Sequence, residues 1–254
     1  SQEDTQAIQN EAENQEDTAS QEDSGGEVIA PQVTEITIEP VLDCSVCATA
    51  IVTLDQPAPV TLLMGKEGTS IAPWVESNET AEHHRIPLLE LHSETTYRVR
   101  VEVDGAESNE EATFTTEPLP PNLPPMKRTI GGDMRQQPGL TLMTVLEWAN
   151  PEGRDFFVIA VDEDGQVVWY HELERMALAL DIDEDRRIYT TDSMLKAVRI
   201  DPYGQTKTEW SVEDLGIESV HHAFQPTTDG GFSLISTELK AIDGWEPSFA
   251  SSSS

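Results

Sequence analysis

The sequence predicts an all-β protein with two folded parts, and three observations lead to that prediction. Short runs rich in Val, Ile and Thr alternate with turn residues from residue 33 onward, and no stretch between them has the apolar periodicity of a helix. A proline-rich segment, 118–125, separates two sets of these runs. In the second set, Asp, Gly and Trp recur at intervals of about 40 residues.

The first 32 residues hold nine acidic residues and no basic one, and almost nothing apolar precedes Val28. Such a segment cannot bury enough surface to offset the entropy lost on ordering, so 1–32 is predicted to be a disordered acidic tail. The chain begins with Ser1, and a polar tail before a β domain is typical of proteins that have lost a signal or lipid-anchored segment. We therefore expect an exported protein.

The composition excludes two classes of partner. The chain has 15 Lys and Arg against 48 Asp and Glu, a formal net charge of −33. Nucleic-acid binding needs a basic surface, which this composition does not supply. The longest apolar runs, such as 156–161, are far shorter than the roughly 20 residues of a transmembrane helix.

Residues 33–117 are predicted to form an antiparallel β-sandwich. Its expected strands are Val33–Ile38, Ala48–Leu54, Val60–Met64, Arg85–Leu89, Thr96–Val103 and Ala112–Thr116. In Tyr97–Val103 every second residue is apolar, which predicts one buried face. The stretch Leu91-His-Ser-Glu-Thr-Thr-Tyr97 resembles the Leu-x-Pro-x-Thr-x-Tyr signature of fibronectin type III domains, with Ser93 at the usual Pro position. That resemblance to an Ig-like family implies that the Tyr97 hydroxyl ties the strand to the preceding corner.

Two sets of residues in this part are candidate metal ligands. Cys44 and Cys47 could form half a zinc site, a redox motif or a short-loop disulfide, but further zinc ligands at matching spacing and a following helix are missing. A structural disulfide or two idle thiols remain as alternatives. His83, His84 and His92 are predicted to be surface loop residues, because neighbours on a strand point to opposite faces.

Residues 118–125 are expected to be a stiff, extended linker, and 126–254 to be repeats. Two pairs of turn residues are 39 apart and a third pair is 44 apart: Asp162 and Asp201, Gly165 and Gly204, Asp185 and Asp229. This period is typical of β-propeller blades, with Trp169 and Trp210 packing between neighbouring sheets. About three blades fit in 126–254, whereas a closed propeller needs four to eight, so we expect a C-terminally truncated chain that is inactive alone.

The pair His221 and His222 is the strongest candidate site. In the segment Ser219-Val-His-His-Ala-Phe-Gln-Pro-Thr-Thr-Asp-Gly-Gly-Phe-Ser-Leu-Ile235 the pair begins a predicted inner strand, where side chains reach a propeller's central channel. Strand alternation allows one of the two to face the channel. The alternative is that both cap the strand and bond to backbone groups. His171 is interpreted as structural, and Arg186 and Arg187 as a solvated charge cluster.

Together, Asp-Gly-Gln-Val-Val-Trp at 164–169, the Ile200-Asp201-x-x-Gly204 echo and His221-His222-x-Phe-x-Pro-x-x-Asp-Gly resemble the bacterial arylsulfate sulfotransferase family, the PAPS-independent, exported type. The resemblance implies a sandwich before a six-bladed propeller, and ping-pong sulfuryl transfer from an aryl sulfate to a phenol through a sulfohistidine. That nucleophile lies in a later blade of the family and is not assigned here. His222, with His221, is expected to bind the sulfate or protonate the leaving group.

The resemblance also sets expectations about surroundings and partners. No metal and no other cofactor is expected, and the protein would be periplasmic, anchored to the outer membrane through a lipid on its precursor, or extracellular. Formation of a homodimer is left as an open alternative. Two other functions remain. The first is a quinoprotein dehydrogenase, because Ala160-Val-Asp162-x-x-Gly165-x-x-x-Trp169 resembles the repeat of those enzymes, with one residue fewer between Asp and Gly. The second is a non-catalytic adhesion or carbohydrate-binding protein.

Overall fold

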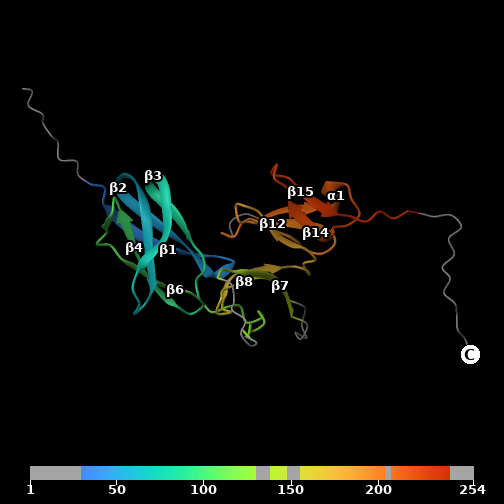
Figure 1. Ribbon diagram of the computed structural model, residues 1–254, viewed down its shortest axis with the longest axis horizontal. Helices are drawn as coiled ribbons and strands as arrows, with labels where there is room; N and C mark the ends of the chain where they lie inside the picture. The colour runs from blue at the N-terminus through green and yellow to red at the C-terminus, as the bar shows by residue number, and fades with distance from the viewer. Residues whose placement is uncertain (1–29, 130–137, 148–154, 204–206, 241–254) are drawn as a thin grey trace, which may run out of the picture. The chain divides into compact units, whose positions relative to one another are not determined.

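The computed structural model describes residues 30–129, 138–147, 155–203 and 207–240. Apart from one short helix, α1 (Val212–Leu215), the regular elements in this part are strands, which confirms the predicted all-β fold (Figure 1). The described residues from Pro31 onward belong to one compact unit. Of the predicted acidic tail, residues 1–29 lie outside the described residues, as does Gly204 of the predicted repeat.

The first six strands form one antiparallel sheet: β1 (Val33–Val41), β2 (Cys44–Lys66), β3 (Ala72–Leu88), β4 (Thr96–Val103), β5 (Ala106–Glu107) and β6 (Ala112–Thr115). β2 joins two predicted strands into one, and its pairing with β3 is irregular between Thr53 and Val60. β3 begins at Ala72, well before the predicted start at Arg85. Most of the residues added to the two strands are exposed, and many are polar, so these extensions gave no signal in the apolar pattern.

This sheet folds over a core of its own. β1 pairs with the first half of β2 and β4 with the second half, yet alternate residues of both halves belong to one buried cluster. The predicted alternation in β4 is confirmed, since its four apolar residues are at most 5% exposed. The Tyr97 hydroxyl accepts a hydrogen bond from the His92 N–H at 2.8 Å, which is the predicted tie to the corner.

The prediction of surface loop histidines is wrong for His84. This residue lies in β3 and is 1% exposed. Its Nε2 donates to the carbonyl oxygens of Ala58 and Ala81, at 2.9 and 3.0 Å, and its Nδ1 lies 3.1 Å from Ser77 Oγ. The irregular pairing of β2 around Ala58 frees that carbonyl from the strand ladder, and the buried imidazole satisfies it. His83, its neighbour, is exposed.

The later strands form three antiparallel sheets in which neighbours along the chain pair. The strands of the first sheet are β7 (Thr141–Glu147), β8 (Asp155–Val161) and β9 (Val167–Leu173). Those of the second are β10 (Leu180–Ile182), β11 (Ile188–Thr191), β12 (Lys196–Ile200) and β13 (Lys207–Ser211). β14 (His221–Pro226) and β15 (Phe232–Ile235) make the third. The turn residues that recur after 39 residues belong to the β8–β9 and β12–β13 connections. Those that recur after 44 residues belong to the β10–β11 and β14–β15 connections.

The Asp turns have the predicted chemistry. Asp162 Oδ1 accepts hydrogen bonds from the backbone N–H of Asp164 and of Gln166, at 2.9 and 2.8 Å. Gly165 has a φ of 79°, a value that an L side chain rarely adopts. Carboxylate and glycine together close the hairpin between β8 and β9.

Each predicted tryptophan packs against the next sheet, which confirms that prediction. Trp169 in β9 is 5% exposed, and its Nε1 donates to the Pro202 carbonyl at 2.7 Å, in the β12–β13 connection. Trp210 in β13 lies with its ring centroid 6.0 Å from Phe224 and 4.8 Å from Phe232, in β14 and β15.

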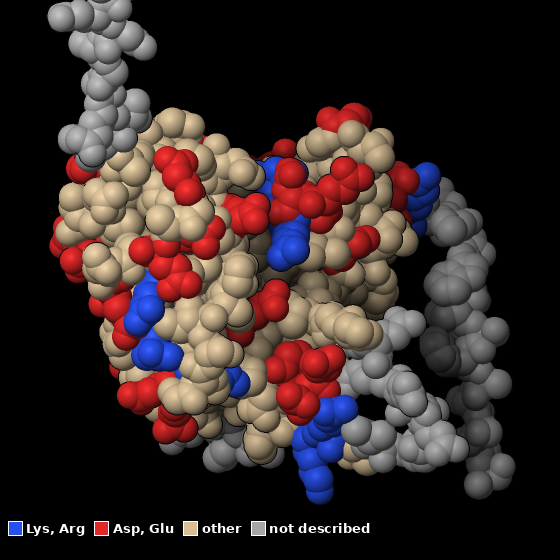
Figure 2. Space-filling view, turned by 60° about the vertical axis from the view of Figure 1, so that its left-hand side comes forward, with Lys and Arg blue, Asp and Glu red and all other residues tan. Residues whose placement is uncertain are grey.

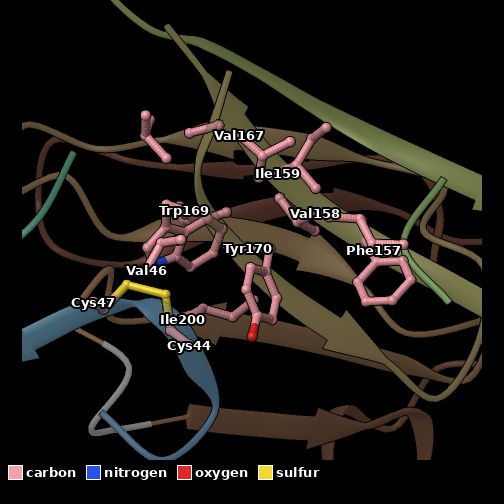
Figure 3. Close-up of a cluster of buried hydrophobic side chains, with 14 of the residues drawn as sticks. Cys44, Val46, Cys47, Phe157, Val158, Ile159, Val167, Trp169, Tyr170 and Ile200 are labelled. Atoms are coloured by element: carbon pink, nitrogen blue, oxygen red, sulfur yellow. A yellow bond between two sulfur atoms is a disulfide. The ribbon is translucent and has the colours of Figure 1, made fainter. Parts of the chain in front are cut away.

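Cys44 and Cys47 form a disulfide, which decides between the alternatives left open by their spacing. Both are buried in a cluster that includes Trp169 and Tyr170 of β9 (Figure 3). The Tyr170 hydroxyl accepts a hydrogen bond from the Ser45 N–H at 2.9 Å. The start of β2 is therefore packed against the β7–β9 sheet.

The proline-rich linker is docked rather than extended. Leu123 is buried in the same cluster as the disulfide, with Leu119 packed against it, and the Leu123 N–H donates to the Pro120 carbonyl at 3.0 Å. Asn122 Nδ2 donates to Asp155 in β8 and to Glu172 in β9. The leucines between the prolines explain the difference, because they can be buried only where the segment turns onto the sheet. None of the described helices has the length and apolar character of a membrane span.

Candidate functional site

The candidate site is a cavity of about 640 Å³ that contains the predicted histidine pair. Phe156 of β8 lines it, together with three later parts of the chain: the segment after β9, the β11–β12 connection and the start of β14. Its lining residues are Phe156, Glu174, Arg175, Met176, Leu178, Ser193, Met194, His221 and His222.

Both histidines line the cavity, whereas strand alternation predicted one. The pairing of β14 with β15 shifts between His221 and Phe224, and His222 has a φ of 48°, in the left-handed region. This bulge interrupts the alternation, and the two rings lie 4.7 Å apart between centroids. A non-glycine residue with positive φ costs free energy, so the surrounding structure must hold His222 in place.

Neither imidazole makes a hydrogen bond to any residue in the described part of the chain. His221 is half-buried and His222 is exposed. Histidines that cap a strand would bond to backbone groups, so the geometry argues against that alternative. The ring nitrogens are available to a ligand, as nucleophiles, proton donors or hydrogen-bond partners.

Hydrogen bonds donated by backbone N–H groups join the three later segments in series. The Arg175 N–H donates to Asp192 Oδ1 at 2.6 Å, and the Ser193 N–H to the Met176 carbonyl at 3.2 Å. The next link runs from the Val220 N–H to the Met194 carbonyl at 2.8 Å, directly before the histidines. The wall is therefore built by contacts between sheets, not by one continuous motif.

The cavity has a polar part and an apolar part. Its lining residues include Arg175, Ser193, His221 and His222, which are polar, and Phe156, Met176, Leu178 and Met194, which are apolar. Glu174 directs its carboxylate to Lys196 Nζ at 3.5 Å. Such a cavity suits a ligand with an aromatic ring at one end and an anionic group at the other.

The other predicted residues lie elsewhere. His171, in β9, lines a separate cavity with Lys207 and Asp43. Burial, with a smaller contribution from the charge of Lys207, lowers the pKa of His171 to about 4. Arg187 pairs with Asp183 and with Asp185 at 2.7 Å each, and these contacts raise the pKa of Arg187. The predicted charge cluster is therefore present around that arginine.

Two features of the site gave no sequence signal. Arg175 and Asp192 belong to no repeat or motif, and only the hydrogen bond between them reveals their relation.

Among the described residues, no group of three or more His, Cys, Asp or Glu is placed to hold a metal ion. On the face seen in Figure 2, acidic side chains outnumber basic ones, and most basic ones lie beside acidic ones.

Comparison with known proteins bears on the part of the chain that holds the cavity. No curated protein matches the sequence. Residues 128–247 match the family model described as arylsulfotransferase (ASST). This segment contains β7 to β15, the turn echoes and the histidine pair. The match therefore supports the arylsulfotransferase family, the one that the sequence motifs resemble.

Proposed function

We propose that this chain is part of an arylsulfate sulfotransferase that moves a sulfuryl group from an aryl sulfate to a phenol. One observation carries the proposal: His221 and His222 lie together on a cavity that also has apolar lining residues. Neither ring forms a hydrogen bond with a described residue, and the cavity belongs to the segment that matches the family model. In this proposal 33–117 is a fibronectin III-like sandwich, 118–125 the connection, and 126–254 the first blades of a propeller.

The reaction divides into two displacements. A neutral imidazole nitrogen attacks sulfur, the sulfur–oxygen bond breaks, and the aryl oxygen leaves with the bonding electrons and takes a proton. The acceptor's phenolic oxygen gives its proton to the imidazole that protonated the first leaving oxygen and attacks the sulfur of the sulfohistidine, and the nitrogen–sulfur bond breaks. We assign His222 and His221 to binding the sulfuryl oxygens or to protonating the leaving oxygen. The family resemblance puts the nucleophile in a later repeat.

The acidity of the chain does not oppose an anionic donor. Charges more than about 10 Å from the bound sulfate are largely screened at physiological salt. Groups that line the cavity act within that distance, and donors directed at the sulfuryl oxygens dominate the local field. The net charge of −33 is shared by all parts of the chain: 1–32, 33–125 and 126–254 are each acidic.

The proposal includes export. The Cys44–Cys47 disulfide is of the kind that forms and persists in oxidising compartments. Together with the acidic N-terminal segment, it supports a periplasmic, outer-membrane-anchored or extracellular protein in a bacterium.

The test is an acceptor-dependent assay of the full-length protein that contains this chain, with 4-nitrophenyl sulfate as donor and phenol as acceptor. We expect 4-nitrophenol release that requires phenol. His222→Ala and His221→Ala should each lower kcat/KM by about 10²-fold or more, because proton transfer and charge stabilisation each contribute on that scale. His83→Ala, an exposed histidine outside the cavity, is the control.

Two outcomes would contradict the proposal. If 4-nitrophenol release does not depend on the acceptor, or does not occur, sulfuryl transfer to phenol is wrong. If the purified protein instead shows a quinone absorbance, the quinoprotein interpretation of the repeat replaces it.

A further inference from the structure

We propose that Met176 and Met194 are modification sites, where hydrogen peroxide oxidises each thioether to a sulfoxide, and that this change weakens the binding of aromatic ligands in the cavity. Met176 follows β9, Met194 lies in the β11–β12 connection, and both line the cavity that contains the histidine pair. The inference rests on the proposed function for the class of ligand, and it adds regulation of the site by an oxidant.

The first argument is the accessibility of the two side chains. Met176 is 42% exposed and Met194 is 43% exposed, which is more than any other methionine in the part of the chain that the structure describes. Met64, by contrast, is 2% exposed in the core of the first sheet. Because peroxide must reach the sulfur from solvent, exposed methionines are oxidised first. The two methionines of the cavity are therefore the ones that an oxidant reaches most readily.

The second argument is that both residues are held in the cavity wall by their backbones. The Met176 carbonyl accepts the Ser193 N–H at 3.2 Å, and the Met194 carbonyl accepts the Val220 N–H at 2.8 Å. These bonds join the later segments of the wall, and neither involves a thioether. Since oxidation changes only the side chain, the wall stays assembled while its lining changes.

The third argument is the share of the lining that would change. The apolar lining residues are Phe156, Met176, Leu178 and Met194, so the methionines are two of the four. A thioether is polarizable and makes favourable contacts with aromatic rings. A sulfoxide oxygen is a hydrogen-bond acceptor, and an aromatic ring that covers it removes it from water without offering a donor. Aromatic ligands should therefore bind the oxidised chain more weakly.

The reaction needs hydrogen peroxide as its one co-reactant. A lone pair of the sulfur attacks a peroxide oxygen, a sulfur–oxygen bond forms, and the oxygen–oxygen bond breaks. The other oxygen leaves with the bonding electrons as hydroxide, and it takes the proton of the attacked oxygen to become water. The sulfur is oxidised and the peroxide is reduced.

The first measurement is peptide mass mapping of the full chain during exposure to hydrogen peroxide. Met176 and Met194 should be oxidised at least about tenfold faster than Met64, because Met64 is buried. Met126 is 37% exposed and does not line the cavity, so it should react at a similar rate and serve as a control for oxidation elsewhere on the surface.

The second measurement is calorimetry with 4-nitrophenol as the aromatic probe. Peroxide treatment should weaken its binding to the wild-type chain by about three- to tenfold. A double variant, Met176→Leu with Met194→Leu, keeps apolar side chains of similar volume, so its affinity should stay within about twofold of wild type before and after treatment. Met126→Leu is the matched control, and it should lose affinity on treatment as wild type does.

The outcomes separate this inference from the proposed function. If Met176 and Met194 are oxidised no faster than Met64, they are not modification sites. If both are oxidised and the affinity for 4-nitrophenol is unchanged, or the double variant loses as much affinity as wild type, the effect on binding is wrong and the proposed function stands. If the untreated wild-type chain binds no 4-nitrophenol, the aromatic ligand of the proposed function is wrong, and the effect on binding is wrong with it.

Circular dichroism of the same samples distinguishes a changed lining from unfolding. The far-UV spectrum of the oxidised wild-type chain should match that of the untreated chain, because the bonds of the wall do not involve the thioethers. A loss of β signal that accompanies the loss of affinity would overturn the inference.

Discussion

The β1–β6 sheet and the sheets of β7 to β15 bury their apolar residues in different ways. The first sheet folds over and closes a core from its own strands. The later sheets share their cores: one cluster joins β8, β9, β11 and β12 with the start of β2, and another joins β11, β12 and β14. A short meander has two faces and no partner layer of its own, so each one depends on its neighbours.

The histidines of the two regions show what this difference means for function. His84, inside the closed core, has a partner for each ring nitrogen. His221 and His222 lie where successive sheets meet, on a bulge, with no partner in the described residues. Strained backbone and unsatisfied polar groups are tolerated at functional sites, so the junctions between sheets are where chemistry is expected.

The largest loss of stability is expected when the packing between sheets is disrupted. Trp169→Ala should lower the free energy of unfolding by about 3–5 kcal/mol, because it opens a cavity and removes the hydrogen bond to Pro202. Hydrogen exchange should show faster exchange in β8, β9, β12 and β13, with much less change in β4. Trp74→Ala, at a tryptophan that is 41% exposed, is the matched control. Equal loss of protection in β4 would contradict the distinction between a closed core and shared cores.

The second effect is a loss of stability at acidic pH. The pKa of His171 is lowered to about 4 in the folded chain, against about 6.5 when unfolded. The unfolded state therefore takes up a proton first as the pH falls, and stability declines between about pH 6.5 and 4, with no further loss below that range. The loss should reach about 2 kcal/mol, since the ring is partly exposed.

Urea unfolding of wild type and His171→Phe at pH 7.5 and 4.5 measures this contribution. The variant should lose less stability than wild type between the two values, whereas His83→Phe, at an exposed site, should behave as wild type does. Identical pH profiles for wild type and His171→Phe would show that burial of this ring is not linked to protonation.

The third effect is confined to the closed core. Tyr97→Phe keeps the buried ring and removes the hydroxyl that accepts the His92 N–H. We expect a loss of about 1 kcal/mol in the free energy of unfolding, with exchange changes in β4 and β6 rather than β12 or β13. Thr115→Ala, at an exposed residue of β6, serves as control. Changes of equal size in β12 would mean that the two regions unfold as one.

The smallest effect concerns a tie between the regions. His92 Nε2 lies 2.9 Å from Asp162 Oδ2, with side chains 25% and 18% exposed. Because a single partly exposed hydrogen bond contributes little, His92→Ala should cost about 0.5–1 kcal/mol in the free energy of unfolding. A loss above that of Trp169→Ala would show that this contact, not the shared apolar cluster, holds the regions together.

Sequence patterns predicted the local features well. The alternation in 97–103, the Asp–Gly turns and the inter-sheet tryptophans depend on neighbours along the chain or on a regular repeat. The predictions failed where a distant segment decided the outcome. The buried position of His84 depends on the irregular pairing of β2, and the docking of 118–125 depends on the surface of β8 and β9.

By itself, the sequence determined the all-β class, the period of the repeats and the histidine pair as the candidate site. Hydrophobic periodicity and turn chemistry depend on residues that are close together along the chain. Only the tertiary structure decided that both histidines face one cavity and that Arg175 joins them. The bulge at His222 arises in the pairing of β14 with β15, and the hydrogen bond that the Arg175 N–H donates to Asp192 joins the segment after β9 to the β11–β12 connection. No spacing in the sequence encodes either feature.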